Sequence, residues 1–220
     1  IIKFQKRNPK TLLSEKEYNN PHPNPFHSYG ATYGEHREHL EFTLNQHNEF
    51  KKYCEKLNRS YSCSVWDTDS AKDISSINID IIKIPSACNL NKDLLECVFK
   101  LHSKEIHISL GMTKRDDINK IFNFADSFKR TKDLVLYVCT SSYPSNSEDL
   151  YLKEIEFLKN TYGGKIKSVG FSGHHTSIIP DVAAIALGVK YIERHFTLNK
   201  SWKGTDHRAS LEIDELRNLM

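Results

Sequence analysis

Several features that define large protein classes are missing from this sequence. No run of apolar residues approaches the length needed to cross a bilayer, so the sequence contains no candidate membrane span. No charge of one sign dominates either: the formal net charge is +3. Such a small and evenly mixed charge argues against nucleic-acid binding, but it is compatible with small anionic substrates. The composition, with 38% hydrophobic and 27% charged residues, is typical of a soluble globular domain.

Two kinds of motif are also absent. The five cysteines are odd in number and widely spaced, and they form no C-x-x-C pair, so neither a disulfide framework nor a zinc site is indicated. Reduced thiols of this kind favour a cytoplasmic protein. No G-x-G-x-x-G or G-x-x-x-x-G-K-[ST] motif opens a helix, which argues against a doubly wound dinucleotide-binding sheet.

The sequence does contain short β-rich runs that alternate with longer helical patterns, as in repeated βα units around a parallel sheet. The predicted strands are 1–5, 61–66, 81–87, 105–111, 134–141, 166–174 and 191–198. The predicted helices are 36–57, 91–102, 116–128, 150–162 and 177–188. Seven βα units are one short of a (β/α)₈ TIM barrel. Because the chain opens on Ile1 within an apolar strand-like run, we expect residues 1–220 to be a truncated barrel domain that lacks its first βα unit.

One connection is unusually long. The stretch from Asn19 to Gly34 is rich in Pro, Asn and Gly, and it exceeds an ordinary βα connection. We therefore predict a functional loop after the first strand.

Polar residues follow the strands at the end where barrel enzymes carry their chemistry. Period-two alternation puts Lys3 and Gln5 on one side of the first strand, where a lysine is unexpected unless it meets a ligand or lies at an exposed edge. The same rule turns His174 inward, and it turns His195 inward on the next strand. Two imidazoles with open positions would suit a Mn²⁺-like ion, whereas two hydrogen-bonded core histidines explain the pattern equally well.

Hydroxyl groups recur at the other strand ends. With Lys83 and backbone N–H groups they could surround a phosphate, although ordinary capping of turns accounts for any one of them. Lys83 and Ser86 have opposite parity, so they share a side only if Pro85 bends the chain out of the strand. The hydroxyl residues are Ser62, Ser64, Ser86, Ser109, Thr140, Ser141 and Ser142.

A set of motifs, in order and spacing, resembles the sialic acid synthases over essentially the whole chain. ERHFTL followed closely by WKGTDHRASLE is the most specific part. The motifs are KFQ (3–5), TYGEHRE (32–38), KIPSACN (83–89), SLGM (109–112), CTSSYP (139–144), GFSGHH (170–175), ERHFTL (193–198) and WKGTDHRASLE (202–212).

The resemblance implies a cytoplasmic N-acetylneuraminate synthase that condenses phosphoenolpyruvate with N-acetylmannosamine and releases phosphate. It implies that His174 and His195 bind a divalent ion, Mn²⁺ or alternatively Mg²⁺ or Co²⁺. It places Ser64, Ser86, Ser109, Ser141 and Ser172, together with Lys83, at the phosphoenolpyruvate site. Lys3, Gln5, Tyr143 and Asp206 match positions near phosphoenolpyruvate or the sugar. The intact protein is expected to be a homodimer.

The sequence departs from the family pattern in three places. No carboxylate stands near Cys88, where many members have one; we expect Cys88 to lie in the mouth loop and to react with thiol reagents faster than Cys97. The first strand, with its Glu and Asn-His motif, is missing, and so is the small C-terminal antifreeze-like domain. The alternatives are a legionaminate or pseudaminate synthase with another N-acetylated amino sugar, or a non-catalytic anion-binding remnant.

Overall fold

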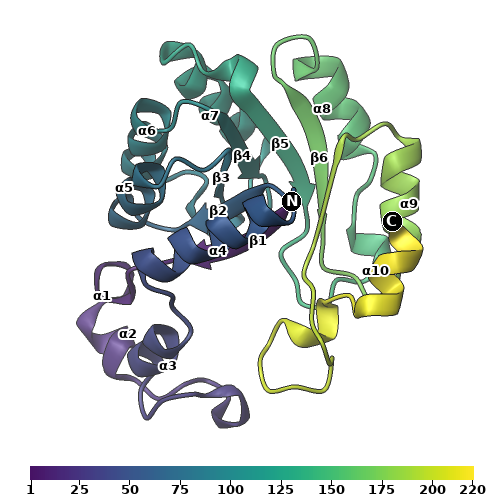
Figure 1. Cartoon of the computed structure of the whole chain (residues 1–220). Coiled ribbons are helices and arrows are strands. Elements are labelled where there is room, and N and C mark those ends of the chain that lie inside the picture. Colours follow the sequence, from purple (N-terminus) through teal and green to yellow (C-terminus); the bar gives the residue numbers. More distant parts are fainter.

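The computed structural model describes residues 1–220, and its centre is one curled, seven-stranded parallel sheet (Figure 1). The strands lie in sequence order, each hydrogen-bonded to the next, so all seven predicted strands are confirmed. They are β1 (Ile2–Lys6), β2 (Tyr61–Val65), β3 (Ile81–Ile84), β4 (Glu105–Ser109), β5 (Leu134–Cys139), β6 (Ser168–Gly173) and β7 (Tyr191–Arg194).

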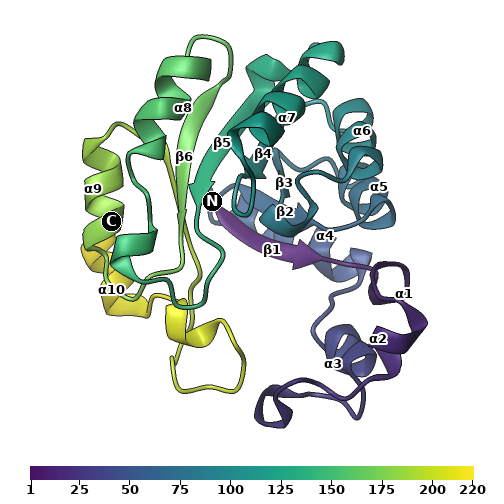
Figure 2. The same ribbon diagram turned by 180° about the vertical axis from the view of Figure 1, so that it is seen from behind.

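The main helices follow their strands and cover the outer side of the sheet, whereas α1 to α3 extend from the end of β1 (Figures 1 and 2). None of the helices is both long enough and apolar enough to span a membrane. They are α1 (Pro9–Leu12), α2 (Glu15–Asn19), α3 (Tyr33–His39), α4 (Leu44–Lys56), α5 (Thr68–Ser76), α6 (Lys92–Leu101), α7 (Arg115–Ser127), α8 (Glu154–Tyr162), α9 (Ile179–Ala186) and α10 (Ile213–Leu219), with 3₁₀ turns η1 (Pro25–His27), η2 (Ser86–Cys88), η3 (Thr131–Asp133), η4 (Ser147–Asp149) and η5 (His207–Ala209).

The face of the sheet beneath the helices forms the hydrophobic core. Ile82, Ile84, Ile106 and Ile108 are fully inaccessible there, and burying each such side chain contributes roughly 1.5–3 kcal/mol. Phe4 belongs to this outer face, because its ring stacks on Phe50 of α4 at 4.8 Å. Alternation therefore leaves most polar residues of the strands on the concave side, whereas Lys6 and Arg194 pair with carboxylates of the covering helices α5 and α9.

The curl brings the first and last strands together on that concave side. Lys3 of β1 and Glu193 of β7 belong to opposite edges of the sheet, yet Lys3 Nζ lies 2.8 Å from Glu193 Oε2. Inward side chains from distant strands consequently share one enclosed space.

The predicted helices needed two corrections, and the bend considered at Pro85 is present. The predicted helix 36–57 is two helices, because Thr43 caps a new one: its Oγ1 accepts from the Gln46 N–H at 3.3 Å, and Gln46 Oε1 accepts from the Thr43 N–H at 2.8 Å. Helix α5 was not predicted, although Asp67 is a good N-cap that accepts from the Ser70 N–H at 2.8 Å. Pro85 does end its strand: β3 stops at Ile84 and η2 begins at Ser86.

Candidate active site

Two lysines share one carboxylate on the concave side of the sheet. Glu193 accepts from Lys3, from Lys83 and, at 2.9 Å, from the Ser172 hydroxyl. Lys83 is almost completely buried, and burial lowers its pKa to about 8 against the opposing charge of Glu193. Burial alone raises the pKa of Glu193, but the charges of Lys3 and Lys83 outweigh it and hold that pKa well below its usual range. Two cations against one anion leave this cluster one positive charge in excess.

Hydroxyl groups surround the lysine cluster. Lys3 Nζ donates to Ser64 Oγ at 3.2 Å, and Ser109 Oγ is buried without any hydrogen-bond partner. A buried hydroxyl without a partner costs free energy, so Ser109 is suited to a ligand atom.

Two more of the predicted serines converge on Gly111. Ser86 Oγ accepts from the Gly111 N–H at 3.1 Å. A Cβ on Gly111 would lie 2.6 Å from Ser86 Oγ and 2.3 Å from Ser141 Oγ, so only glycine leaves both hydroxyls in place. The predicted phosphoenolpyruvate residues therefore lie around one space, although they come from five different strands and their loops.

The two predicted metal ligands meet at the carboxyl ends of β6 and β7. The rings of His174 and His195 have centroids 5.4 Å apart, and the Tyr143 ring lies 4.2 Å from that of His174. His174 Nδ1 lies 2.8 Å from the Thr140 carbonyl oxygen, which fixes the proton on Nδ1 and leaves Nε2 as an acceptor. Burial lowers the pKa of His195 to about 4, so this imidazole is neutral.

These residues fit a divalent cation with open coordination positions. Asp206 Oδ2 lies 3.9 Å from His195 Nδ1 and is the nearest carboxylate to the pair. No three His, Cys, Asp or Glu side chains form a complete ligand set. Two neutral imidazoles would therefore hold an ion that takes its remaining ligands from water and substrate oxygens.

Gln5, the remaining predicted site residue, faces the same space from β1. Its side-chain oxygen accepts from Trp66 Nε1 at 3.0 Å. All twelve predicted site residues thus lie on the concave side or at its mouth, but Gln5 and Asp206 are toward the edge formed by the loops after β1 and β7.

Sequence reasoning missed a buried ion-pair network behind the histidines. Asp181 of α9 is inaccessible; its Oδ2 lies 3.2 Å from His175 Nε2 and also pairs with Arg194. Arg194 Nη2 donates in addition to the His175 carbonyl oxygen. Because His175 follows His174 and Arg194 precedes His195, this network fixes both strand ends. The motifs GHH and ERH contain His175 and Arg194, next to the two predicted metal ligands, but nothing in the sequence places Asp181 beside them.

Two cysteines also differ from expectation. Cys88 does lie in the loop after β3, in η2, but it is buried there: its thiol donates to the Trp66 carbonyl oxygen at 3.3 Å, and burial raises its pKa to about 11. Burial raises the pKa of Cys97 as well, but Cys97 is the more accessible of the two, which favours faster reaction at Cys97. Cys139 was not singled out; burial raises the pKa of its thiol, but the neighbouring His174, Ser86 and Lys83 outweigh burial, and the pKa falls to about 7.

A curled parallel sheet that gathers excess positive charge and a histidine pair at the carboxyl ends of its strands is arranged as in α/β barrel enzymes, whose active sites lie at that end. The family model described as "NeuB family" matches residues 1–220, and the chain belongs to this family.

Two curated relatives match nearly all of the chain. Human N-acetylneuraminate-9-phosphate synthase is 35% identical over 218 residues, which cover 99% of this chain and 59% of the human protein. The N,N'-diacetyllegionaminic acid synthase of Campylobacter jejuni is 32% identical over 220 residues, which cover 100% of this chain and 65% of that protein. The chain spans less than two thirds of the length of either relative.

A solved structure confirms the fold. The N-acetylneuraminic acid (sialic acid) synthetase from Leptospira borgpetersenii serovar Hardjo-bovis, in complex with citrate, superposes with a TM-score of 0.83 at 25% identity. The match covers 99% of this chain and 69% of the Leptospira chain.

Proposed function

We propose that the protein condenses phosphoenolpyruvate with an N-acetylated amino sugar, N-acetylmannosamine or a derivative of it, to give a sialic acid and phosphate. The observation that carries the proposal is the pair of lysines sharing Glu193 next to the two histidines, since this cluster has one positive charge in excess. Phosphoenolpyruvate is a small anion of the kind that such an excess attracts.

The residues of the concave face have different roles in this reaction. Lys83 and Lys3 bind the anionic groups of phosphoenolpyruvate, with Lys83 Nζ holding its proton beside the phosphate. The hydroxyls of Ser86, which the Gly111 N–H holds in place, and of Ser109 orient the phosphate and exclude water from it. A divalent ion on His174 and His195, Mn²⁺ in our proposal, would polarise the sugar aldehyde when bound.

The bonds and protons balance as follows. A C–C bond forms between C3 of phosphoenolpyruvate and the aldehyde carbon as the C2=C3 and C=O π bonds open. Water then adds its oxygen to C2 and one of its protons goes to the new alkoxide oxygen. The C2–O bond to phosphate breaks last, and the remaining hydroxyl proton at C2 leaves with the phosphate as the C2 ketone forms. The buried, hydrogen-bonded lysine and hydroxyl groups stabilise the departing phosphate without having to reorganise.

The test uses the full-length gene product that contains these residues. It is incubated with phosphoenolpyruvate, Mn²⁺ and one amino sugar at a time, while phosphate release and product mass are measured. Phosphate release that requires both sugar and metal, with a nine-carbon sugar acid as product, supports the proposal. Absence of release with every amino sugar would overturn it.

A legionaminate synthase is the second candidate, because the Campylobacter jejuni enzyme of that name matches the chain over its whole length. The same assay with 2,4-diacetamido-2,4,6-trideoxymannose separates the two candidates. A higher kcat/KM for this diacetamido sugar would favour the second.

The complete architecture is also proposed. We infer a (β/α)₈ barrel in which a further strand pairs between β7 and β1, because these two edges already approach each other through Lys3 and Glu193 but are not hydrogen-bonded to one another. We also propose a cytoplasmic homodimer. Light scattering and a crystal structure of the full-length gene product would test both.

A further inference from the structure

Two arginines lie together at the outer edge of the site. Arg7 follows β1, and Arg37 belongs to α3. The Arg7 guanidinium carbon is 5.4 Å from the centre of the Trp66 ring, and that of Arg37 is 5.8 Å from the same ring. Arg37 also lies 5.6 Å from the ring of Tyr33. Both guanidinium groups therefore lie against the same Trp66 ring.

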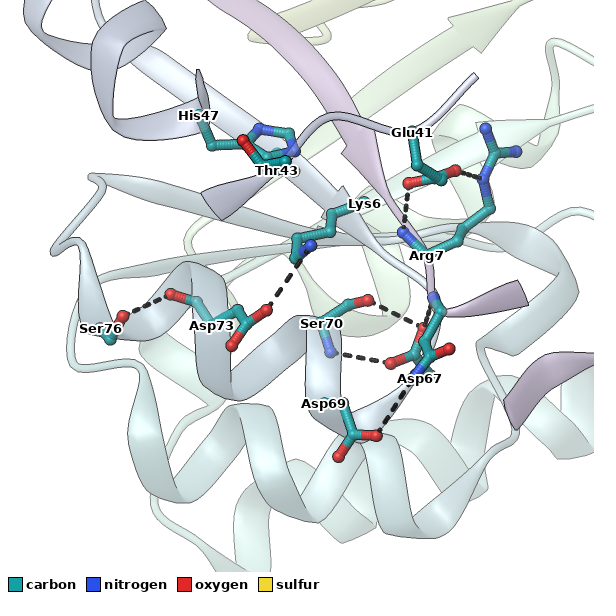
Figure 3. Close-up of polar contacts among 12 residues, drawn as sticks. Lys6, Arg7, Glu41, Thr43, His47, Asp67, Asp69, Ser70, Asp73 and Ser76 are labelled. Carbon is teal, nitrogen blue, oxygen red and sulfur yellow. Dashed lines mark hydrogen bonds and ion pairs between the residues drawn. The ribbon is translucent and has the colours of Figure 1, made fainter. Parts of the chain in front are cut away.

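Only one carboxylate is hydrogen-bonded to this pair. Glu41 accepts from Arg7 Nε at 2.6 Å and from the Arg7 backbone N–H at 2.8 Å, and Figure 3 shows the two terminal nitrogens of Arg7 pointing away from it. The Arg37 side chain makes no hydrogen bond and no ion pair, and its contacts are with aromatic rings.

The other carboxylates on α3 are already engaged. Glu35 accepts from the N–H groups of Ala31 and Thr32 at 2.8 and 3.2 Å, and Glu38 lies 3.6 Å from Lys10 Nζ. Burial and the charge of Arg7 lower the pKa of Arg37. A partly desolvated guanidinium without a hydrogen-bonded partner is costly, and a bound anion would offset that cost.

The arginine pair is connected to the predicted sugar residues. Trp66, which both arginines approach, donates to Gln5 at 3.0 Å. Asp206 lies 3.9 Å from His195 Nδ1, and its charge partly offsets the lowering of the Arg37 pKa by burial. The pair is therefore linked to Gln5 through the Trp66 side chain.

The loops that carry these residues are joined. The Tyr29 hydroxyl donates to the Lys203 carbonyl oxygen at 2.8 Å, and the Gly204 N–H donates to His27 Nδ1 at 3.0 Å. The segment before α3 is thus fixed to the segment that carries Asp206, although they are far apart in the sequence.

We propose that Arg7 and Arg37 bind a phosphate group on the amino sugar, at the end opposite its aldehyde, so that the substrate is a phosphorylated N-acetyl amino sugar. This inference rests on the proposed function, which puts the aldehyde at His174 and His195. A sugar chain that starts there passes Asp206 and Gln5 and ends at the arginines. Guanidinium groups bind phosphate oxygens through paired N–H donors, which suits this role.

The kinetic test compares N-acetylmannosamine with its 6-phosphate in the full-length gene product. We expect the phosphorylated sugar to have the higher kcat/KM, and Arg37→Met to reduce the ratio of the two kcat/KM values on the order of tenfold to a hundredfold, as for a lost charged hydrogen bond. Arg37→Lys keeps the charge and should retain part of the ratio. The control Arg59→Met changes an exposed arginine just before β2, at the opposite end of the strands, and should leave the ratio unchanged.

A binding measurement separates this inference from the proposed function. If neither sugar supports phosphate release, the proposed function fails, and calorimetry with N-acetylmannosamine 6-phosphate still decides the inference. Tighter binding of the phosphorylated sugar than of the neutral one, lost in Arg37→Met and kept in Arg59→Met, supports it. Equal binding of the two sugars, or equal loss of both in Arg37→Met, would overturn it.

Discussion

The concave face of the sheet has two halves, and they differ in how completely their charged and polar groups are paired. In the half toward the amino ends of the strands, Glu105 accepts from the Tyr191 hydroxyl at 2.6 Å and pairs with Lys167 at 3.0 Å, while His107 Nδ1 lies 2.8 Å from the Tyr137 hydroxyl. Every polar group named there has a partner. In the half toward the carboxyl ends, Lys3 and Lys83 share Glu193 as their only carboxylate, and Ser109 Oγ has no hydrogen-bond partner.

The difference separates a structural network from a binding site. A closed network gains its partners on folding, so it contributes to stability and has nothing left to offer a ligand. A network with one cation in excess and an unpartnered hydroxyl is completed only when an anion binds.

Loss of a histidine ligand should have the largest effect. His174→Ala should lower kcat by about 1,000-fold or more, because Lewis-acid stabilisation is worth several kcal/mol. The measurement is phosphate release during a Mn²⁺ titration, with circular dichroism as the control for folding. Full metal-dependent activity in the variant would remove His174 from the metal site.

Removing a cation from the open half should weaken anion binding. Lys83→Met removes the charge excess, so we expect the Kd of phosphoenolpyruvate to rise about 100-fold, in line with a buried charged hydrogen bond.

The wild-type protein should show the same dependence on charge as a function of pH. The pKa of Lys83 is about 8, so in the absence of ligand Lys83 loses its charge as the pH rises through 8. Affinity for phosphoenolpyruvate should therefore fall between pH 7 and 9 more steeply in the wild type than in Lys83→Met. If calorimetry showed the same change of the phosphoenolpyruvate Kd with pH in the wild type and in Lys83→Met, this assignment would be contradicted.

Breaking the closed half should change stability instead. Glu105→Gln should lower the free energy of unfolding at pH 7 by about 1–3 kcal/mol, as expected for lost charged hydrogen bonds, and leave phosphoenolpyruvate affinity unchanged. Hydrogen bonding from His107, with further hydrogen bonds from Tyr191 and Lys167, lowers the pKa of Glu105 to about 2.

The sign of the pH dependence follows from that lowered pKa. A carboxyl group with a folded-state pKa below its ordinary value of 4.5 stabilises the fold above pH 4.5, and this contribution is lost as the pH falls toward 2. Urea unfolding should therefore show a larger difference between wild type and Glu105→Gln at pH 6 than at pH 3. The same difference in the free energy of unfolding at both pH values would contradict the lowered pKa of Glu105.

Thiol reactivity should show the smallest effect. Burial raises the pKa of both thiols, to about 11 for Cys88, but Cys97 is the more accessible of the two, so Cys97 should react with a disulfide reagent about tenfold faster. Labelling followed by mass spectrometry of the peptides measures both rates, and Cys97→Ser identifies the faster phase. Faster labelling of Cys88 would restore the original expectation.

Strand alternation was enough to predict the sheet and the direction of most site residues. Lys3, Ser172 and His174 face inward as the period-two pattern requires, and the ring contact between His174 and His195 followed from placing both on neighbouring strands. Long-range proximity was not predictable in this way. Glu193 was not singled out from the sequence, because its role depends on the curl that brings β7 against β1.

Two other features depend on three-dimensional packing for the same reason. Asp181 lies on a helix, and no sequence pattern indicates that it pairs with Arg194 behind the histidines. The helix predicted over 36–57 placed Arg37 within a longer helix, whereas the break before Thr43 makes α3 a separate helix, on which Arg37 approaches Trp66.

The contrast between the two halves is tested most directly by the Kd of phosphoenolpyruvate, measured by calorimetry at pH 7 for the wild type, Lys83→Met and Glu105→Gln in the full-length gene product. We expect Lys83→Met to weaken binding about 100-fold and Glu105→Gln to bind like the wild type despite its lower stability. Equal weakening in both variants, or unchanged binding in Lys83→Met, would contradict the division of the concave face into a closed structural network and an anion-binding site.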